Sequence, residues 1–161
     1  MSKKILIVGG CGFIGHNLAL ELKKVGHEPY VIDSLAINNI YSIEDTEFEN
    51  KELYTSILKK RIQLLKDNKI FLKVMDARDY HATSSCYAEF NPDIIIHLAA
   101  VSHANKSNKD PKSTFDHSLR TLEKEKKSTL FICRQVWFMG NLIIKKFPKI
   151  IFVNQLEFMG L

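Results

Sequence analysis

The residues most able to do chemistry in this sequence are glycines at every third position, directly behind a short apolar run. Gly9, Gly12 and Gly15 follow Ile5–Val8, and the apolar spacing beyond them predicts a helix that stops at Gly26. Glycines between a strand and a helix allow a tight turn and let backbone N–H groups approach a phosphate. The helix also points its positive end at that charge. This turn therefore predicts a phosphate-binding site.

An acidic residue ends the next predicted strand. Pro29–Asp33 is mostly apolar up to its last residue, and Asp33 lies near the ~20-residue distance at which an acid holds the hydroxyls of an adenosine ribose. A carboxylate there repels a 2′-phosphate, so the strand, turn and acid together favour NAD over NADP. The alternative is that Asp33 only caps a turn.

The rest of the chain alternates strands and helices. The expected elements are strands at 70–74 and 94–98, helices at 53–65, at 80–90 and after Pro111, and a polar loop at 38–50. Such alternation requires right-handed crossovers and gives a parallel sheet with helices on both faces. The prediction is a Rossmann-type, doubly wound α/β fold that is truncated.

Four stretches resemble the extended short-chain dehydrogenases, especially the NAD-dependent nucleotide-sugar epimerases and dehydratases: GGCGFIG, VIDSL, MDARD and DIIIHLAAVSHANKSNKDP. The resemblance runs from Lys4 to about Glu123. It implies that NAD is the cofactor, with its pyrophosphate on the glycine turn, its adenine by Asp76 and Ala77, and its pyrophosphate and ribose along 98–100. The cofactor-binding residues expected on this basis are Gly9, Gly12, Phe13, Ile14, Gly15, Asp33, Ser34, Asp76, Ala77, Leu98, Ala99 and Ala100.

The catalytic residues of that family are missing. Its reaction needs a tyrosine that removes a hydroxyl proton while hydride goes to NAD, and a lysine four residues later that lowers the pKa of the tyrosine. None of the five tyrosines has a lysine at that distance, and the serine-rich fifth strand and the substrate-binding part are also absent. We therefore expect no catalytic residue, and activity only if another polypeptide supplies the missing pair.

The sequence changes in character after about Glu123, and a shift of reading frame would explain the change. When the last base of each codon is read with the first two of the next, 137–140 must become Val, then Tyr or His, then Gly. Residues 157–160 must become Ile or Val, then Tyr or His, then Gly. The codons upstream of 137 permit MSSSMVYG, which is the missing fifth-strand motif.

Two organisations of the chain follow from this observation. The favoured one has an NAD-binding Rossmann portion at 1–127 and an out-of-frame apolar tail at 128–161. The alternative is a genuine tail that supplies edge strands, formed by Phe131, Ile132, Val136 and 150–153.

Composition narrows the class of protein. The net charge of +5 comes from 23 basic and 18 acidic residues, but the bases are scattered, which argues against a nucleic-acid surface. The three cysteines lack CxxC spacing, so neither a disulfide framework nor a metal site is predicted. No stretch reaches the ~20 apolar residues of a membrane span. We expect a cytoplasmic protein that binds neither nucleic acid nor membrane.

Three interpretations of function stay open. The favoured one is the NAD-binding portion of a nucleotide-sugar epimerase or dehydratase, inactive alone, whose intact relatives take a nucleotide sugar and form homodimers. The second is a non-catalytic NAD-binding or regulatory module. The third is a truncated product that barely folds, because half of its sheet would lack partners.

Overall fold

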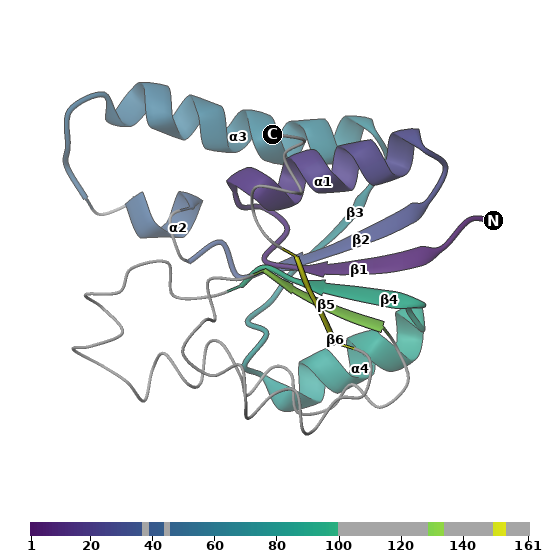
Figure 1. The fold of residues 1–161 in the computed structure, drawn as a ribbon. Coiled ribbons are helices and arrows are strands. Elements are labelled where there is room, and N and C mark those ends of the chain that lie inside the picture. The colour runs from purple at the N-terminus through teal and green to yellow at the C-terminus, as the bar shows by residue number, and fades with distance from the viewer. Residues whose placement is uncertain (37–38, 44–45, 100–128, 134–149, 154–161) are drawn as a thin grey trace.

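In a computed structural model of the protein, the first apolar run forms an inner strand of a parallel sheet (Figure 1). The structure describes residues 1–36, 39–43, 46–99, 129–133 and 150–153. Its elements are β1 (Lys4–Val8), α1 (Phe13–Lys24), β2 (Glu28–Asp33), α2 (Ile40–Ile43), α3 (Lys51–Asp67), β3 (Phe71–Val74), α4 (Tyr80–Phe90), β4 (Ile94–His97), β5 (Thr129–Cys133) and β6 (Ile150–Val153).

The strands lie in the order β3-β2-β1-β4-β5-β6, and each neighbouring pair is parallel. In register, Val8 of β1 faces Ile32 of β2 on one side and His97 of β4 on the other. The carboxyl ends of β1, β2 and β4 therefore meet at one edge of the sheet. This arrangement confirms the predicted Rossmann-type α/β fold.

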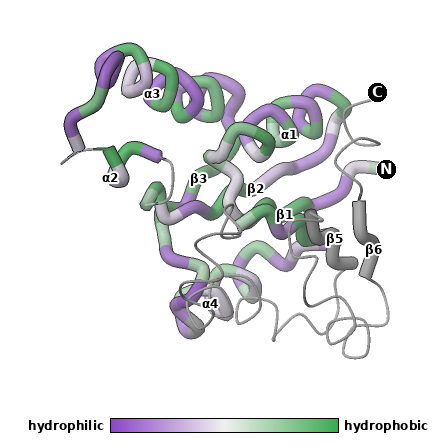
Figure 2. Tube along the Cα trace, turned by 60° about the vertical axis from the view of Figure 1, so that its left-hand side comes forward, coloured by the Kyte–Doolittle hydropathy of each residue, from purple (hydrophilic) through white to green (hydrophobic). Residues whose placement is uncertain are grey.

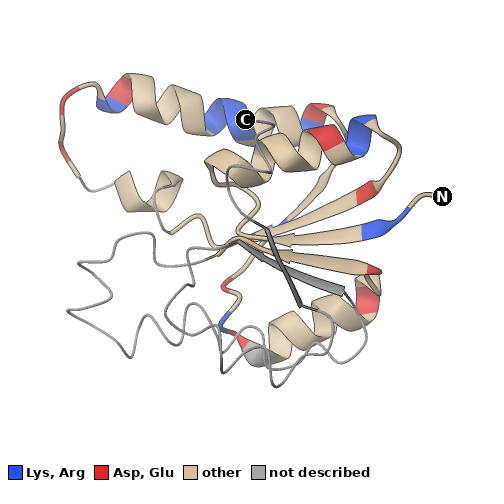
Figure 3. Cartoon of the chain, viewed as in Figure 1, with Lys and Arg blue, Asp and Glu red and all other residues tan. Residues whose placement is uncertain are grey.

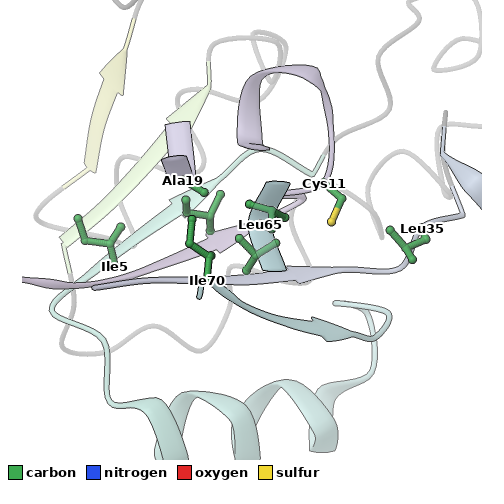
Figure 4. Close-up of a cluster of buried hydrophobic side chains, with 8 residues drawn as sticks. Ile5, Cys11, Ala19, Leu35, Leu65 and Ile70 are labelled. Carbon is green, nitrogen blue, oxygen red and sulfur yellow. The ribbon is translucent and has the colours of Figure 1, made fainter. Parts of the chain in front are cut away.

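Helices cover both faces of the sheet, with α1 and α3 on one side and α4 on the other (Figure 1). Alternate residues of β1 point to opposite faces, which separates two buried clusters. Ile5 and Ile7 pack with Ala19 of α1 and Leu65 of α3 (Figure 4). On the opposite face, Leu6, Val8, Ile32 and Ile95 pack with Cys86 and Phe90 of α4. The apolar bands of α1 and α3 alternate with polar ones along each helix (Figure 2).

The structure differs from the sequence prediction in the polar loop expected at 38–50. Residues Ile40–Ile43 form the short helix α2, because side chains at its start bond to the backbone. The Ser42 hydroxyl accepts from the Asn39 N–H at 2.9 Å and donates to the Asn39 carbonyl at 2.7 Å. The Ile40 N–H donates to the Asn39 side chain at 2.9 Å.

The strand β4 is not the edge of the sheet, because β5 pairs with it and β6 pairs with β5. The half of the sheet that the third interpretation leaves without partners thus has β5 and β6 beside β4, and the weak folding expected there stays a prediction. The alternative of a genuine tail expects edge strands that include Phe131, Ile132 and 150–153. In the structure, strands lie at 129–133 and 150–153. Val136 and the helix expected after Pro111 lie outside the described residues, and the shifted reading frame stays a prediction. In the part of the chain that the structure describes, no helix is long and apolar enough to span a membrane.

Candidate functional site: the glycine turn and the carboxyl edge of the sheet

Gly9 begins the turn after β1, in a backbone conformation and a packing environment that only glycine suits. Its φ is +79°, and its N–H donates to the Ile32 carbonyl at 2.8 Å. A Cβ on Gly9 would lie 2.7 Å from the backbone nitrogen of Ala99. The N–H groups of Leu98 and Ala99 donate to the Val8 carbonyl at 2.8 and 3.1 Å. The structure thus brings the segment after β4 against the glycine turn.

The other two predicted glycines have different surroundings. A Cβ on Gly15 would lie 2.6 Å from the Cα of Gly10, so this glycine lets α1 pack onto the turn. A Cβ on Gly12 would meet only the Gly9 carbonyl, at 3.4 Å. Packing within the described residues therefore requires a glycine at position 15 but leaves space at position 12.

The first turn of α1 is suited to an anion. Gly12 is the N-cap, it makes no side-chain capping hydrogen bond, and the first turn holds no acidic residue. The N–H groups of Phe13 and Ile14 belong to this turn, where the helix dipole is positive. Arg61 of α3 adds a positive charge nearby, with its Cζ 5.7 Å from the centre of the Phe13 ring. Figure 3 shows basic residues of α3 beside α1.

Asp33 holds the turn together from the end of β2. Its Oδ2 accepts from the Cys11 N–H at 2.8 Å and its Oδ1 accepts from the Leu35 N–H at 2.8 Å. Burial raises the pKa of Asp33, and these two hydrogen bonds oppose the rise. The turn-capping role that the sequence left as an alternative is therefore present. A carboxylate has about four acceptor positions, so two remain for a ligand. The Ser34 hydroxyl beside it accepts from the Ala36 N–H at 3.3 Å.

The sequence prediction missed a contact between Cys11 of this turn and Asn39, which precedes α2. Asn39, 2% exposed, donates from Nδ2 to the Cys11 carbonyl at 3.3 Å and so ties the start of α2 to the glycine turn. Cys11 is 1% exposed, and burial, with the Asp33 charge as a smaller cause, raises the pKa of its thiol to about 12. No spacing in the sequence pairs Asn39 with Cys11, because the contact depends on how the two loops meet.

Histidines occupy buried positions near the site. The Nδ1 of His16 lies 2.9 Å from the Gly12 carbonyl oxygen, a contact that the sequence prediction missed although the pair has helical spacing. Burial lowers the pKa of His16, and Arg61 adds to the effect. His97 is 1% exposed, and burial lowers its pKa to about 4.

The predicted adenine segment follows β3 at the same edge of the sheet. The Met75 N–H donates to the Asp33 carbonyl at 3.0 Å, which fixes the segment beside the end of β2. Asp76 forms an ion pair with Arg78, and the Ala77 carbonyl accepts from the Thr83 hydroxyl at 3.2 Å. Asp79 caps α4 by accepting from the Ala82 N–H at 3.1 Å.

The structure brings eleven of the predicted site residues to this one edge; Ala100 lies outside the described residues. Within the described ranges, no group of three metal-ligating side chains occurs. Burial raises the pKa of Tyr30 to about 12. That shift is opposite to the one that a catalytic phenolate needs.

Comparison with known proteins places these features in context. A family model described as "NAD dependent epimerase/dehydratase family" matches residues 5–123. Protein CapI of Staphylococcus aureus is 33% identical over 116 residues, which cover 72% of this chain and 30% of that protein. UDP-glucose 4-epimerase of Neisseria meningitidis serogroup B is 28% identical over 117 residues, covering 73% of this chain and 30% of that enzyme. The chain thus spans about 30% of the length of these relatives.

Solved structures agree on the fold. UDP-glucose-4-epimerase from Stenotrophomonas maltophila, crystallised with bound NAD and formylated UDP-arabinopyranose, superposes with a TM-score of 0.60 at 23% identity. The match covers 81% of this chain and 36% of that one. UDP-glucose 4-epimerase of Thermus thermophilus, in complex with NAD, superposes with a TM-score of 0.57 at 22% identity, covering 81% of this chain and 37% of that one.

Proposed function

The chain belongs to the NAD-dependent epimerase/dehydratase family, and from that premise we propose that it forms the NAD-binding portion of a nucleotide-sugar epimerase or dehydratase. The observation that carries the proposal is the glycine turn. Gly12 has space on its Cβ side, and the first turn of α1 has no side-chain cap and no acid. A pyrophosphate would occupy that space and accept from the N–H groups of Phe13 and Ile14.

The other predicted residues fit an extended dinucleotide along the same edge. Asp33 keeps two acceptor positions for ribose hydroxyls while it holds the turn, and Ser34 follows it. Asp76 and Ala77 would lie by the adenine. Leu98, Ala99 and Ala100 would run along the pyrophosphate and ribose on the β4 side, where Ala99 already contacts Gly9. NAD is favoured over NADP, because the Asp33 carboxylate would face a 2′-phosphate.

In this proposal the chain contributes binding and orientation rather than proton transfer. Bound NAD supplies a hydride acceptor for a sugar carbon. The residues of the turn fix the pyrophosphate, and the carboxylate of Asp33 fixes the ribose. The chain has no tyrosine followed four residues later by lysine, which is the pair that removes the sugar hydroxyl proton in the family's reaction. We infer that the chain does not turn over a nucleotide sugar alone.

The same absence favours a second candidate, a non-catalytic NAD-binding module. Both candidates predict NAD binding, and they differ in whether a second polypeptide completes the site. Co-expressing the chain with the part of a UDP-glucose 4-epimerase that lies beyond the matched residues, and assaying epimerisation of UDP-glucose, separates them. Turnover that neither polypeptide shows alone favours the epimerase portion. NAD binding without turnover in the mixture favours the module.

The direct test uses the full chain and isothermal calorimetry with NAD. We expect saturable binding at one site, and at least a tenfold loss of affinity in Gly12→Ala, because the added methyl group occupies the space for the pyrophosphate. The free energy of unfolding should fall by less than about 1 kcal/mol, the cost of alanine at an N-cap. Gly26→Ala, at the other end of α1 with nothing within 4 Å of its Cβ, is the matched control and should leave affinity unchanged. Equal affinities in the wild type and Gly12→Ala would reject the proposed site.

A further inference from the structure

Two donors of one histidine hold the carbonyl group at the N-cap of α1. The backbone N–H of His16 donates to the Gly12 carbonyl oxygen at 3.2 Å, and the Nδ1 of the same residue lies 2.9 Å from that oxygen. Because a carbonyl oxygen can only accept, Nδ1 carries the hydrogen in this contact. The side chain thus makes the shorter of the two hydrogen bonds, and it does so from a position that is 7% exposed.

The other end of the same peptide unit carries a group of the proposed cofactor site. The Gly12 carbonyl and the Phe13 N–H belong to one planar, trans peptide, in which the two groups point in opposite directions. A hydrogen bond that holds the carbonyl toward the body of α1 therefore directs the Phe13 N–H out of the start of the helix. That N–H is one of the two donors from which the proposed pyrophosphate would accept.

The peptide that His16 holds follows the residue type that restricts the backbone least. Glycine limits rotation about its backbone bonds less than any other residue, and Gly12 has no side chain with which to cap the helix. Its own N–H donates to the Gly9 carbonyl at 3.4 Å, which is long for a hydrogen bond of this kind. A fixed direction for the Phe13 N–H therefore depends on the bonds that the Gly12 carbonyl accepts.

The next peptide shows the same arrangement at an exposed position. The Nδ2 of Asn17 donates to the Phe13 carbonyl at 3.0 Å, and that peptide carries the Ile14 N–H. Asn17 is exposed whereas His16 is buried, so water competes with the Asn17 bond more than with the His16 bond. The Asn17 contact also shows that an asparagine side chain in this helix reaches the carbonyl four residues earlier.

Resting on the proposed function, we propose that His16 is a positioning residue of the cofactor site, which holds the Gly12 carbonyl so that the Phe13 N–H is aimed at the pyrophosphate before NAD binds. A donor that is already in place loses less conformational freedom when the ligand binds, which favours affinity. A carbonyl that accepts a hydrogen bond also polarises its peptide, and this strengthens the N–H at the other end as a donor.

The test measures the NAD affinity of the full chain by calorimetry at about pH 8. Burial lowers the pKa of His16 and Arg61 adds to the effect, so the pKa lies below the ordinary value of about 6.5 and the ring is neutral at this pH. A variant therefore changes the hydrogen bond without changing the charge. His16→Leu should weaken binding by about threefold to tenfold, the effect of one lost hydrogen bond. His16→Asn restores a donor and should bind NAD within about twofold of the wild type.

Asn68→Leu is the matched control. The Nδ2 of Asn68 donates to the Leu64 carbonyl at 2.9 Å at the end of α3. This variant loses a bond of the same kind away from the glycine turn, so its NAD affinity should equal that of the wild type. Urea unfolding of each variant shows whether the fold is kept. His16→Ala, which also lacks a donor, takes the place of His16→Leu if the latter does not fold.

The outcomes separate this inference from the function on which it rests. A wild type that does not bind NAD overturns the proposed function. A wild type that binds NAD, with equal affinity in His16→Leu, overturns the role of His16 and leaves NAD binding intact. If His16→Asn binds as weakly as His16→Leu, or if Asn68→Leu weakens binding as much, then the loss comes from packing or from stability, and the positioning role is wrong.

Discussion

Replacing Gly9 by alanine tests the contact between the glycine turn and the segment after β4. Gly9 has a φ of +79°, and an L-residue in that region costs about 1–2 kcal/mol. The new Cβ would also lie 2.7 Å from the nitrogen and 3.0 Å from the Cα of Ala99. Both are backbone atoms, so relief requires movement of the chain, and overpacking of this kind costs about 1–3 kcal/mol. We expect the free energy of unfolding to fall by about 2–5 kcal/mol.

Gly26→Ala separates the two contributions. Gly26 has a similar φ of +89°, but a Cβ there would have nothing within 4 Å. Its substitution should therefore cost only the conformational part, about 1–2 kcal/mol. Urea unfolding followed by circular dichroism measures both variants. If Gly9→Ala is no more destabilising than Gly26→Ala, then Ala99 does not lie against the turn and the described site geometry is wrong.

Three further predictions concern titration and hydrogen bonding. His97 has a pKa of about 4 in the folded state against about 6.5 when unfolded. Its contribution to the free energy of unfolding is therefore fully present above about pH 6.5 and is lost as the pH falls toward 4. The loss should reach about 3 kcal/mol, and urea unfolding between about pH 7 and pH 4 should show a smaller pH slope in His97→Gln; equal slopes would show that His97 is not the group responsible. Asp33→Asn must point its NH2 group at the N–H of Cys11 or Leu35, which should lower the free energy of unfolding by about 1–3 kcal/mol; an unchanged value would mean that Asp33 does not hold the turn. The thiol of Cys11, buried with a pKa of about 12, should react with iodoacetamide in mildly alkaline buffer far more slowly in the native chain than in urea, as peptide mass spectrometry can measure; similar rates would contradict its burial.

The first four strands were predictable because each is a short, mostly apolar run. The runs at 5–8, 29–33, 70–74 and 94–98 match β1, β2, β3 and β4 to within one residue at each end. Alternation with amphipathic helices then restricts the topology to a parallel sheet. The glycine turn was predictable for the same reason, since its position between a strand and a helix follows from sequence order.

Contacts between loops were not predictable. The helix α2 depends on hydrogen bonds between Asn39 and Ser42, and four residues are too few for helical periodicity to appear. The bond from Asn39 to the Cys11 carbonyl joins segments that meet only after β1 and β2 have paired. Asp33 was predicted as a ribose ligand from its position, whereas its role in holding the turn required the coordinates of two backbone N–H groups.

Hydrogen exchange of the backbone amides, with and without saturating NAD, tests whether the glycine turn binds the cofactor. We expect increased protection of the amides of Gly12, Phe13 and Ile14, because the pyrophosphate would accept from this turn. The helix α3 should exchange at the same rate in both states over its charged outer face. If calorimetry shows that NAD binds while the amides of this turn gain no protection, NAD binds elsewhere and the glycine turn is not the cofactor site.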